Sequence, residues 1–236
     1  MLDETFYLDG IDARSVGLRL QSHIAFNKAV QIVESQTIPG RNGNLIFETG
    51  SYENRVGTAS CFCLQKDVEM AISSAGRFLM GKKGYRRLET SDDPDHYWMA
   101  RVENSPQISM RLRALAPFDI SFDCKPQRFL KSGENTIVFT ANGTLYNQYG
   151  QTALPIITLY GQGKGTLTIG DCVVEVKELD EVLFLDSETQ NAYNDNGNQN
   201  MNINAPIFPT LRDGENKIGF SGGIERVEIV PRWWEL

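Results

Sequence analysis

The sequence predicts a mostly β fold, in which an N-terminal domain packs its strands against one α-helix and a second domain is built only of strands. Only residues 64–80 carry apolar side chains at steps of three and four, the spacing of an amphipathic helix. The other segments are mainly short alternating or β-branched runs between turn-forming residues, as in antiparallel sheets. A change in charge near residue 128 indicates the domain boundary.

The first half is expected to place three strands on each side of the helix. The strands before it are residues 29–33, 45–49 and 56–63, with a turn at 39–43. The helix itself is expected over residues 64–80 and ends at Gly81. Its apolar side must be core, so we expect Ile72→Asp to cost roughly several kcal/mol. Strands at 85–89, 97–103 and 109–122 follow, with a turn at 92–95.

The second half is expected to form an antiparallel sandwich. The segment 124–128 interrupts the pattern, so the domains are residues 1–128 and 129–236. Seven short strands are predicted at 135–140, 155–160, 165–169, 172–176, 182–186, 217–220 and 225–229. Turns are expected at 142–143, 161–165 and 213–214, and the Asn-rich residues 191–204 are expected to form a long loop.

Composition excludes several classes of protein. The chain has 236 residues, of which 41% are hydrophobic and 22% charged, so it is neither disordered nor fibrous. No run approaches the roughly 18 apolar residues of a membrane-spanning helix, so we expect a water-soluble protein without a membrane partner. The first residues, MLDETFYLDG, are acidic and lack the apolar core of a secretory signal.

Charge is distributed unequally between the two halves. The net charge is −7, and residues 129–236 hold 7 basic and 14 acidic side chains, while residues 1–128 hold 16 of each. Neither half offers the net basic face that nucleic-acid binding requires, so no nucleic-acid partner is expected.

One dense cluster of ionisable groups, Asp92, Asp93, Asp95 and His96, could suggest a cation loop or an acid–base pair. A solvated hairpin turn explains it more simply, because the twelfth position of a calcium loop starting at Asp92 is Glu103, inside the next predicted strand.

Two glycine-containing motifs also have simpler explanations. GKKGYRR (81–87) resembles a basic patch with a stacking aromatic, but the acids at 92–95 should lie across a hairpin and reduce its field, so a charged rim or a subunit contact is favoured. GQGKG (161–165) is followed by a strand and not by a helix, so it is interpreted as a turn between strands and not as a phosphate loop.

No residue is expected to serve catalysis, bind a cofactor or ligate a metal. The sequence has no GxSxG motif and no Cys near a His. We interpret Cys61, Cys63, Cys124 and Cys172 as reduced, buried side chains. Trp233 and Trp234 could stack on sugar, but anchors to the core or to an interface are favoured.

The order of these features resembles a known family. IPGRNGNLIFETGSYENR (38–55), then the helix, RRLETSDDPDHYWMARVENSP (86–106) and FDISFDCKP (118–126) are similar to the N-terminal domain of the distal tail protein of long-tailed, non-contractile bacteriophages. PIITLYGQGKGTLTIG (155–170), Leu-Asp-Ser-Glu (185–188) followed by Tyr193, FPTLRDGENKIGF (208–220) and IVPRWWEL (229–236) resemble that family's galectin-like C-terminal sandwich.

The resemblance implies a structural role without enzymatic activity, in a phage or a prophage. The N-terminal domains would form a ring of typically six copies between the tail tube protein and the tail-associated hub protein. The C-terminal domains would support receptor-binding proteins. The protein would assemble in the host cytoplasm and reside at the virion tail tip. A lectin-like carbohydrate-binding module is the alternative function, based on the sandwich and the terminal tryptophans.

Overall fold

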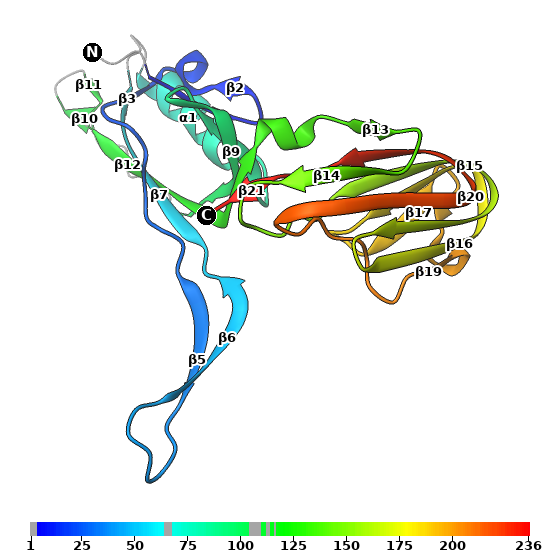
Figure 1. Ribbon diagram of the computed structural model, residues 1–236. Helices are drawn as coiled ribbons and strands as arrows, with labels where there is room; N and C mark the ends of the chain where they lie inside the picture. Colours follow the sequence, from blue (N-terminus) through cyan, green and yellow to red (C-terminus); the bar gives the residue numbers. More distant parts are fainter. Residues whose placement is uncertain (1–3, 64–67, 104–109, 112–113, 116) are drawn as a thin grey trace. The chain divides into compact units, whose positions relative to one another are not determined.

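The computed structural model describes residues 4–63, 68–103, 110–111, 114–115 and 117–236. The fold is mostly β and antiparallel, as predicted, and α1 (Val68–Met80) is the only α-helix in the described part of the chain (Figure 1). The chain folds into two compact units, a first unit that extends to Arg128 and a second unit that runs from Phe129 to Glu235.

The first unit is built on one antiparallel sheet with the strand order β2-β1-β8-β9-β12-β7-β3, in which β4 also pairs with β7. The bounds of its strands are β1 Phe6–Leu8, β2 Ile11–Asp12, β3 Leu18–Leu20, β4 Ala25–Phe26, β7 Arg55–Cys63, β8 Arg86–Thr90, β9 Asp93–Val102 and β12 Phe118–Leu130. A 3-10 turn (η1, Ala13–Val16) follows β2. Two further pairs of strands form separate two-stranded ribbons that do not join this sheet. They are β5 (Gln31–Gln36) with β6 (Leu45–Tyr52) and β10 (Met110–Arg111) with β11 (Ala114–Leu115).

Helix α1 packs on the first unit through an apolar face. Ala75, Phe78 and Leu79 are buried, and the Phe78 ring lies 6.0 Å from that of Phe6 in β1. The predicted burial of this face is therefore confirmed for these three residues. The helix ends before Gly81, where a Cβ would collide with the carbonyl oxygen of Arg77. The expected first turn, 64–67, and the side chain of residue 72 lie outside the described part of the structure.

The first unit differs from the prediction at two places. Residues 124–128 are not a break, because β12 continues through them. Residues 93–95 belong to β9, and the turn that precedes it is at Ser91 and Asp92. In addition, β1 to β4 near the N-terminus were not predicted, because runs of two or three residues are too short to show a period.

The second unit is an antiparallel sandwich built around three long strands. These are β15 (Ile156–Ile169), β16 (Cys172–Asp186) and β20 (Gly214–Val230). One half of each long strand pairs in the order β13-β20-β15-β16-β17-β18. The other halves of β20, β15 and β16 also pair in that order, with β14 at the edge beside β20 and β19 at the edge beside β16. The short strands are β13 Ile137–Phe139, β14 Gly143–Asn147, β17 Asn191–Asn194, β18 Gly197–Asn198 and β19 Ile203–Asn204. A further strand, β21 (Trp234–Glu235), pairs with β12 and not with the sandwich. The 3-10 turns are η2 (Lys131–Glu134) and η3 (Asn200–Asn202).

Glycines allow β15 and β20 to bend together. A Cβ on Gly161 would collide with the carbonyl oxygen of Gly223, and a Cβ on Gly223 would collide with that of Gln162. The ladder between the two strands shifts register between Gly161 and Gly165. Residues 161–165 are therefore a bend inside β15, and the prediction of a turn between two strands was wrong.

The predictions of seven short strands and one long loop need the same correction. Residues 172–176 and 182–186 are two parts of β16, and residues 217–220 and 225–229 are two parts of β20. The Asn-rich segment 191–204 contains β17, β18, η3 and β19, because its side-chain amides hold it in place. Asn200 Oδ1, for example, accepts a bond of 2.6 Å from the Ala192 amide.

Candidate functional site

The most unusual surface of the first unit is the β5–β6 hairpin, which we call the arm and define as residues 31–52. Its two strands pair with each other and with no further strand in the described part of the chain (Figure 1). None of the residues from Val30 to Asn54 is buried. An isolated two-stranded ribbon is marginally stable in water, so such an element generally depends on a further contact.

The arm exposes apolar side chains on both faces. Val33 pairs with Glu48 and Ser35 with Ile46, so these four residues form one face. Glu34 pairs with Phe47 and Gln36 with Leu45, which form the other. The side chains of Ile46, Phe47 and Val33 are 60%, 50% and 48% exposed. Large apolar groups at such exposure on one element indicate an interaction surface.

The tip and the root of the arm are both fixed by hydrogen bonds. At the tip, the Asn44 amide nitrogen donates to Ser35 Oγ at 2.8 Å, and Gly40 and Gly43 have φ values of 82° and 79°, which favour glycine. At the root, the Glu53 amide donates to the Val30 carbonyl at 2.8 Å. The sequence predicted both strands and this turn, but it gave no sign that they leave the main sheet.

A buried carboxylate, Asp123 of β12, connects the root of the arm to the main sheet. Its oxygens accept from Asn54 Nδ2 at 2.8 Å, Tyr85 Oη at 3.2 Å and Arg101 Nε at 2.6 Å. Burial raises the pKa of Asp123, but the hydrogen bonds from Arg101 and Asn54 outweigh burial and hold the pKa below its ordinary value. Asn54 stands between β6 and β7, so this network fixes the point at which the arm begins.

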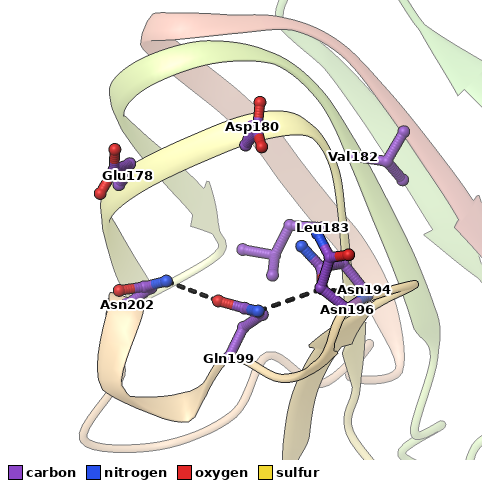
Figure 2. Close-up of a pocket in the computed structure, with 8 residues that line it drawn as sticks. All are labelled: Glu178, Asp180, Val182, Leu183, Asn194, Asn196, Gln199 and Asn202. Atoms are coloured by element: carbon purple, nitrogen blue, oxygen red, sulfur yellow. Dashed lines mark hydrogen bonds between the residues drawn. The ribbon is translucent and has the colours of Figure 1, made fainter.

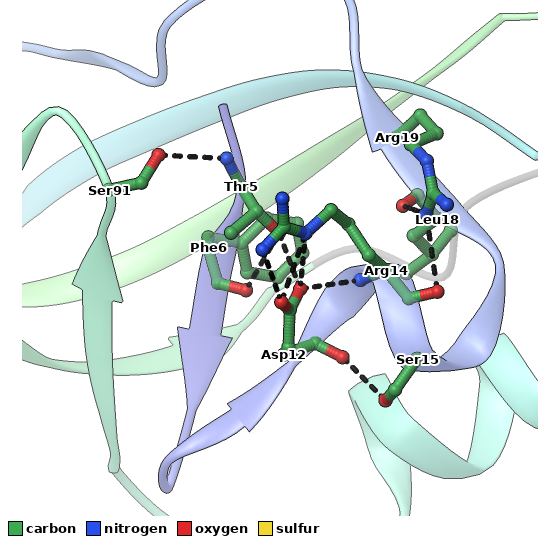
Figure 3. A network of polar contacts seen from close by, with 8 residues as sticks. All are labelled: Thr5, Phe6, Asp12, Arg14, Ser15, Leu18, Arg19 and Ser91. Atoms are coloured by element: carbon green, nitrogen blue, oxygen red, sulfur yellow. Dashed lines mark hydrogen bonds and ion pairs between the residues drawn. The ribbon is translucent and has the colours of Figure 1, made fainter. Parts of the chain in front are cut away.

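A second polar network holds the start of the chain (Figure 3). Asp12 caps η1 and accepts from Thr5 Oγ1 at 2.7 Å and from the Arg14 amide at 2.8 Å. Arg14 Nη2 lies 2.8 Å from the other Asp12 oxygen, and the Thr5 amide donates to Ser91 Oγ at 2.9 Å. All of these groups satisfy one another, so the network is structural.

The Asp92–His96 cluster is divided between separate partners. Asp92 Oδ2 lies 3.1 Å from His23 Nδ1, whereas Asp93 bonds His96 Nδ1 at 2.6 Å and Arg128 Nη2 at 2.6 Å. Burial raises the pKa of Asp93, but the bonds from His96 and Arg128 hold it below its usual value. Asp92 and Asp93 thus pair with different side chains and do not share a common partner.

Three basic residues of GKKGYRR, Lys82, Arg86 and Arg87, are neutralised, but by different acids from those predicted. Lys82 Nζ and Arg86 Nε lie 2.9 and 3.0 Å from Asp9 Oδ2, and Arg87 Nε bonds Glu89 at 2.5 Å. The Asp92–Asp95 turn was expected to do this. The buried Arg86 also donates to the Phe78 carbonyl at 2.6 Å, where its charge complements the C-terminal end of α1.

The cysteines and tryptophans have structural surroundings. Cys61 and Cys124 are buried thiols, and burial raises the pKa of the Cys124 thiol to about 12. Cys172 is only half-buried, in contrast to the prediction, and the side chain of Cys63 lies outside the described part of the structure. Trp233 belongs to the core of the second unit, and Trp234 Nε1 donates to the Thr152 carbonyl at 3.0 Å.

The second unit contains a polar pocket of about 210 Å³ between the middle of β16 and the Asn-rich segment (Figure 2). Its polar lining consists of Glu178, Asp180, Asn194, Asn196, Gln199 and Asn202. Asn202 donates to Gln199 at 2.5 Å, and Gln199 donates to Asn194 at 3.0 Å. None of the described residues that line it is aromatic. The sequence singled out these asparagines as a loop only.

Metal clusters and membrane-spanning helices are both absent from the described residues. No three His, Cys, Asp or Glu side chains are grouped closely enough to hold a metal ion there. No helix in the same residues is long and apolar enough to cross a membrane.

The fold can be compared with known proteins. The sequence matches no family model and no curated protein. Among solved structures, the chain resembles SPP1 Dit (gp 19.1), whose structure is described as a paradigm of the hub adsorption apparatus in phages that infect Gram-positive bacteria. The TM-score is 0.69 at 14% sequence identity, and the match covers 97% of this chain and 98% of that one. This chain therefore has the fold of Dit along almost its whole length.

Proposed function

We propose that this protein is a structural subunit of a phage tail tip, a distal tail protein that forms a ring. The observation that carries the proposal is the fold. A match over 97% of this chain and 98% of Dit means that both units are shared, with almost nothing added or lost. The segments that resemble the distal tail family are distributed in the same order along both units.

The two units have different roles in this proposal. Residues 1–128 form the ring, with six copies, and join the tail tube protein to the tail-associated hub protein. Because residues 1–128 hold equal numbers of basic and acidic side chains, the net electrostatic repulsion between copies of this unit is small. Residues 129–236 carry the excess of negative charge and support receptor-binding proteins.

The role is one of assembly and not of catalysis. The ionisable clusters named above pair within the chain, as Asp93 does with Arg128 and Asp123 with Arg101. The protein would assemble in the host cytoplasm and remain in the virion at the tail tip.

Negative-stain imaging and mass measurement of the purified full-length chain test this proposal. We expect ring-shaped particles with a mass of six subunits at micromolar concentration. A chain that stays monomeric at all concentrations, and also in the presence of the tail tube and hub proteins, would contradict the ring.

Carbohydrate binding by the second unit is a second candidate function. The observation that favours it is the pocket of Figure 2, where side-chain amides and the carboxylates of Glu178 and Asp180 could bond sugar hydroxyls. A glycan array probed with the full-length chain tests it. Binding that disappears in Asp180→Ala and persists in Asp171→Ala, an exposed acid outside the pocket, would support it.

A further inference from the structure

We propose that the arm of one subunit docks on the exposed side of α1 of the next subunit, with Glu48 facing Arg77. This inference rests on the proposed ring and names the contact that closes it. It follows from two surfaces of the same chain that complement each other in charge and in apolar character.

The first surface is the arm face formed by Val33, Ser35, Ile46 and Glu48. Its two aliphatic side chains, Val33 and Ile46, are 48% and 60% exposed, whereas Leu45 on the opposite face is half-buried beside the 50% exposed Phe47. The carboxylate of Glu48 has no ion-pair or hydrogen-bond partner in the described part of the chain. An exposed apolar face with an unpaired charge at its edge suits a specific contact with a basic partner.

The second surface is the side of α1 that faces away from the core, formed by Ser73, Gly76, Arg77 and Met80. All four residues are exposed, and Met80 is 53% exposed although it is apolar. Ser73, Gly76 and Met80 recur at steps of three and four, so they share one face of the helix. A Cβ on Gly76 would meet nothing within 4 Å, so a strand could approach the helix closely at this position.

The charges of the two surfaces are opposite. Arg77 forms no ion pair within the described residues, and Lys83, just beyond the helix, is likewise exposed and unpaired there. Because the first unit has no net charge, the attraction between Glu48 and Arg77 would be local and would not come from opposite net charges of the two subunits. Charged pairs across an interface set its register and exclude wrong partners more than they add affinity.

The occupant is a second copy because both complementary surfaces lie on one chain. The arm and the outer side of α1 are different patches, so a contact between them is head-to-tail. Head-to-tail contacts repeat from copy to copy and close into a ring where the rotation permits. A tail protein of another kind would use only one of the two surfaces and leave the other without an explanation.

The test is a charge exchange in the full-length chain, with subunit association measured by sedimentation velocity. We expect Glu48→Arg and Arg77→Glu each to weaken association by at least about tenfold, because each places like charges together. The double variant should restore it. Glu34→Arg, the same change on the opposite face of the arm, is the matched control and should assemble like the original protein.

Two further variants test the apolar part of the contact. Ile46→Ser should weaken association, whereas Phe47→Ser on the opposite face should not. Circular dichroism and the melting temperature of each variant at a concentration where the protein is monomeric verify that the subunit still folds.

The outcomes separate this contact from the ring itself. The proposed contact is wrong, and the ring itself stands, if the original protein and Glu48→Arg form rings equally well. The same conclusion holds if the original protein forms rings but the double variant does not recover subunit association. If the original protein forms no assembly, alone or with its tail partners, both proposals fail. If the arm variants lose only binding to another tail protein, the occupant is that protein and the inference is overturned.

Discussion

Single residues decide how rigidly the arm is attached to the first unit. Asp123 is 7% exposed and binds three side chains, which come from the arm root, from the residue before β8 and from β9. A buried carboxylate is favourable only while such partners remain, because an unpaired buried polar group costs free energy. The network therefore couples the direction of the arm to the packing of the sheet.

We expect Asp123→Ala to lower the free energy of unfolding by about 2 kcal/mol, because it removes the acceptor that Asn54, Tyr85 and Arg101 share. Asp123→Asn keeps an acceptor oxygen and should cost less. Chemical denaturation of each variant, under conditions where the protein is monomeric, measures the difference. Equal stability of Asp123→Ala and the original chain would show that the network contributes nothing.

The paired carboxylates also predict a dependence of stability on pH. Burial raises the pKa of the paired carboxylates, but bonds to neighbouring side chains, mainly Arg and Lys, lower the pKa by more than burial raises it. The folded pKa therefore lies below the ordinary value at five residues, Asp9, Asp12, Asp93, Asp123 and Asp186. The unfolded chain then binds more protons than the folded chain as the pH falls below about 4 to 5. The stabilisation is present above that range and is lost on further acidification.

Urea midpoints at pH 6, 4 and 3 measure this effect. The midpoint should fall with pH, and Asp93→Asn should reduce the slope because one titrating group is removed. A midpoint that stays constant from pH 6 to pH 3 would contradict the assignment of these carboxylates.

At the scale of elements, the fold of the second unit depends on the common bend of β15 and β20. Gly161 and Gly223 approach each other so closely that neither position has room for a side chain. Three long strands can contribute to both layers of the sandwich only if this bend is tight.

We expect Gly223→Ala to destabilise the protein by roughly 2–3 kcal/mol, because its Cβ would press on the carbonyl of Gln162 and force the strands apart. Gln162→Ala, at the same bend but with an exposed side chain, is the control and should change stability little. Thermal melts of both variants give the comparison. A Gly223→Ala protein as stable as the control would mean that the bend is loose.

The elements also show what local sequence can and cannot predict. The position and end of α1 follow from its period and from Gly81, because both are local properties. The path of β15 through residues 161–165 was missed, because a glycine-rich bend and a turn look alike until the partner strand is known. The same holds for the arm: its strands were predicted, but pairing with the main sheet is a long-range property that alternation does not reveal.

At the scale of the whole molecule, charge separates the two units. Residues 129–236 have a surplus of seven negative charges, whereas residues 1–128 are neutral. Copies of the second unit should therefore repel one another, whereas copies of the first unit can approach one another.

Sequence motifs for catalysis or metal binding could not have revealed the arm, because its significance lies in the exposure of its side chains and not in their residue types.

We expect residues 1–128 alone to associate and residues 129–236 alone to remain monomeric. Light scattering on the two fragments at modest salt, beside the full-length chain, measures this. A monomeric first fragment together with an oligomeric second fragment would reverse the assignment of the ring. Two monomeric fragments would instead indicate that the ring needs the tail tube or the hub protein as a template.

The unpaired edges of the arm have a consequence for the free subunit before it meets any partner. Two open strand edges with Ile46 and Phe47 exposed could template fibril-like stacking of further chains. Glu34 and Glu48, one on each face, oppose such stacking because parallel copies would bring equal charges together. The Glu48 carboxylate that we propose for the ring contact would thus also oppose aggregation of the free subunit.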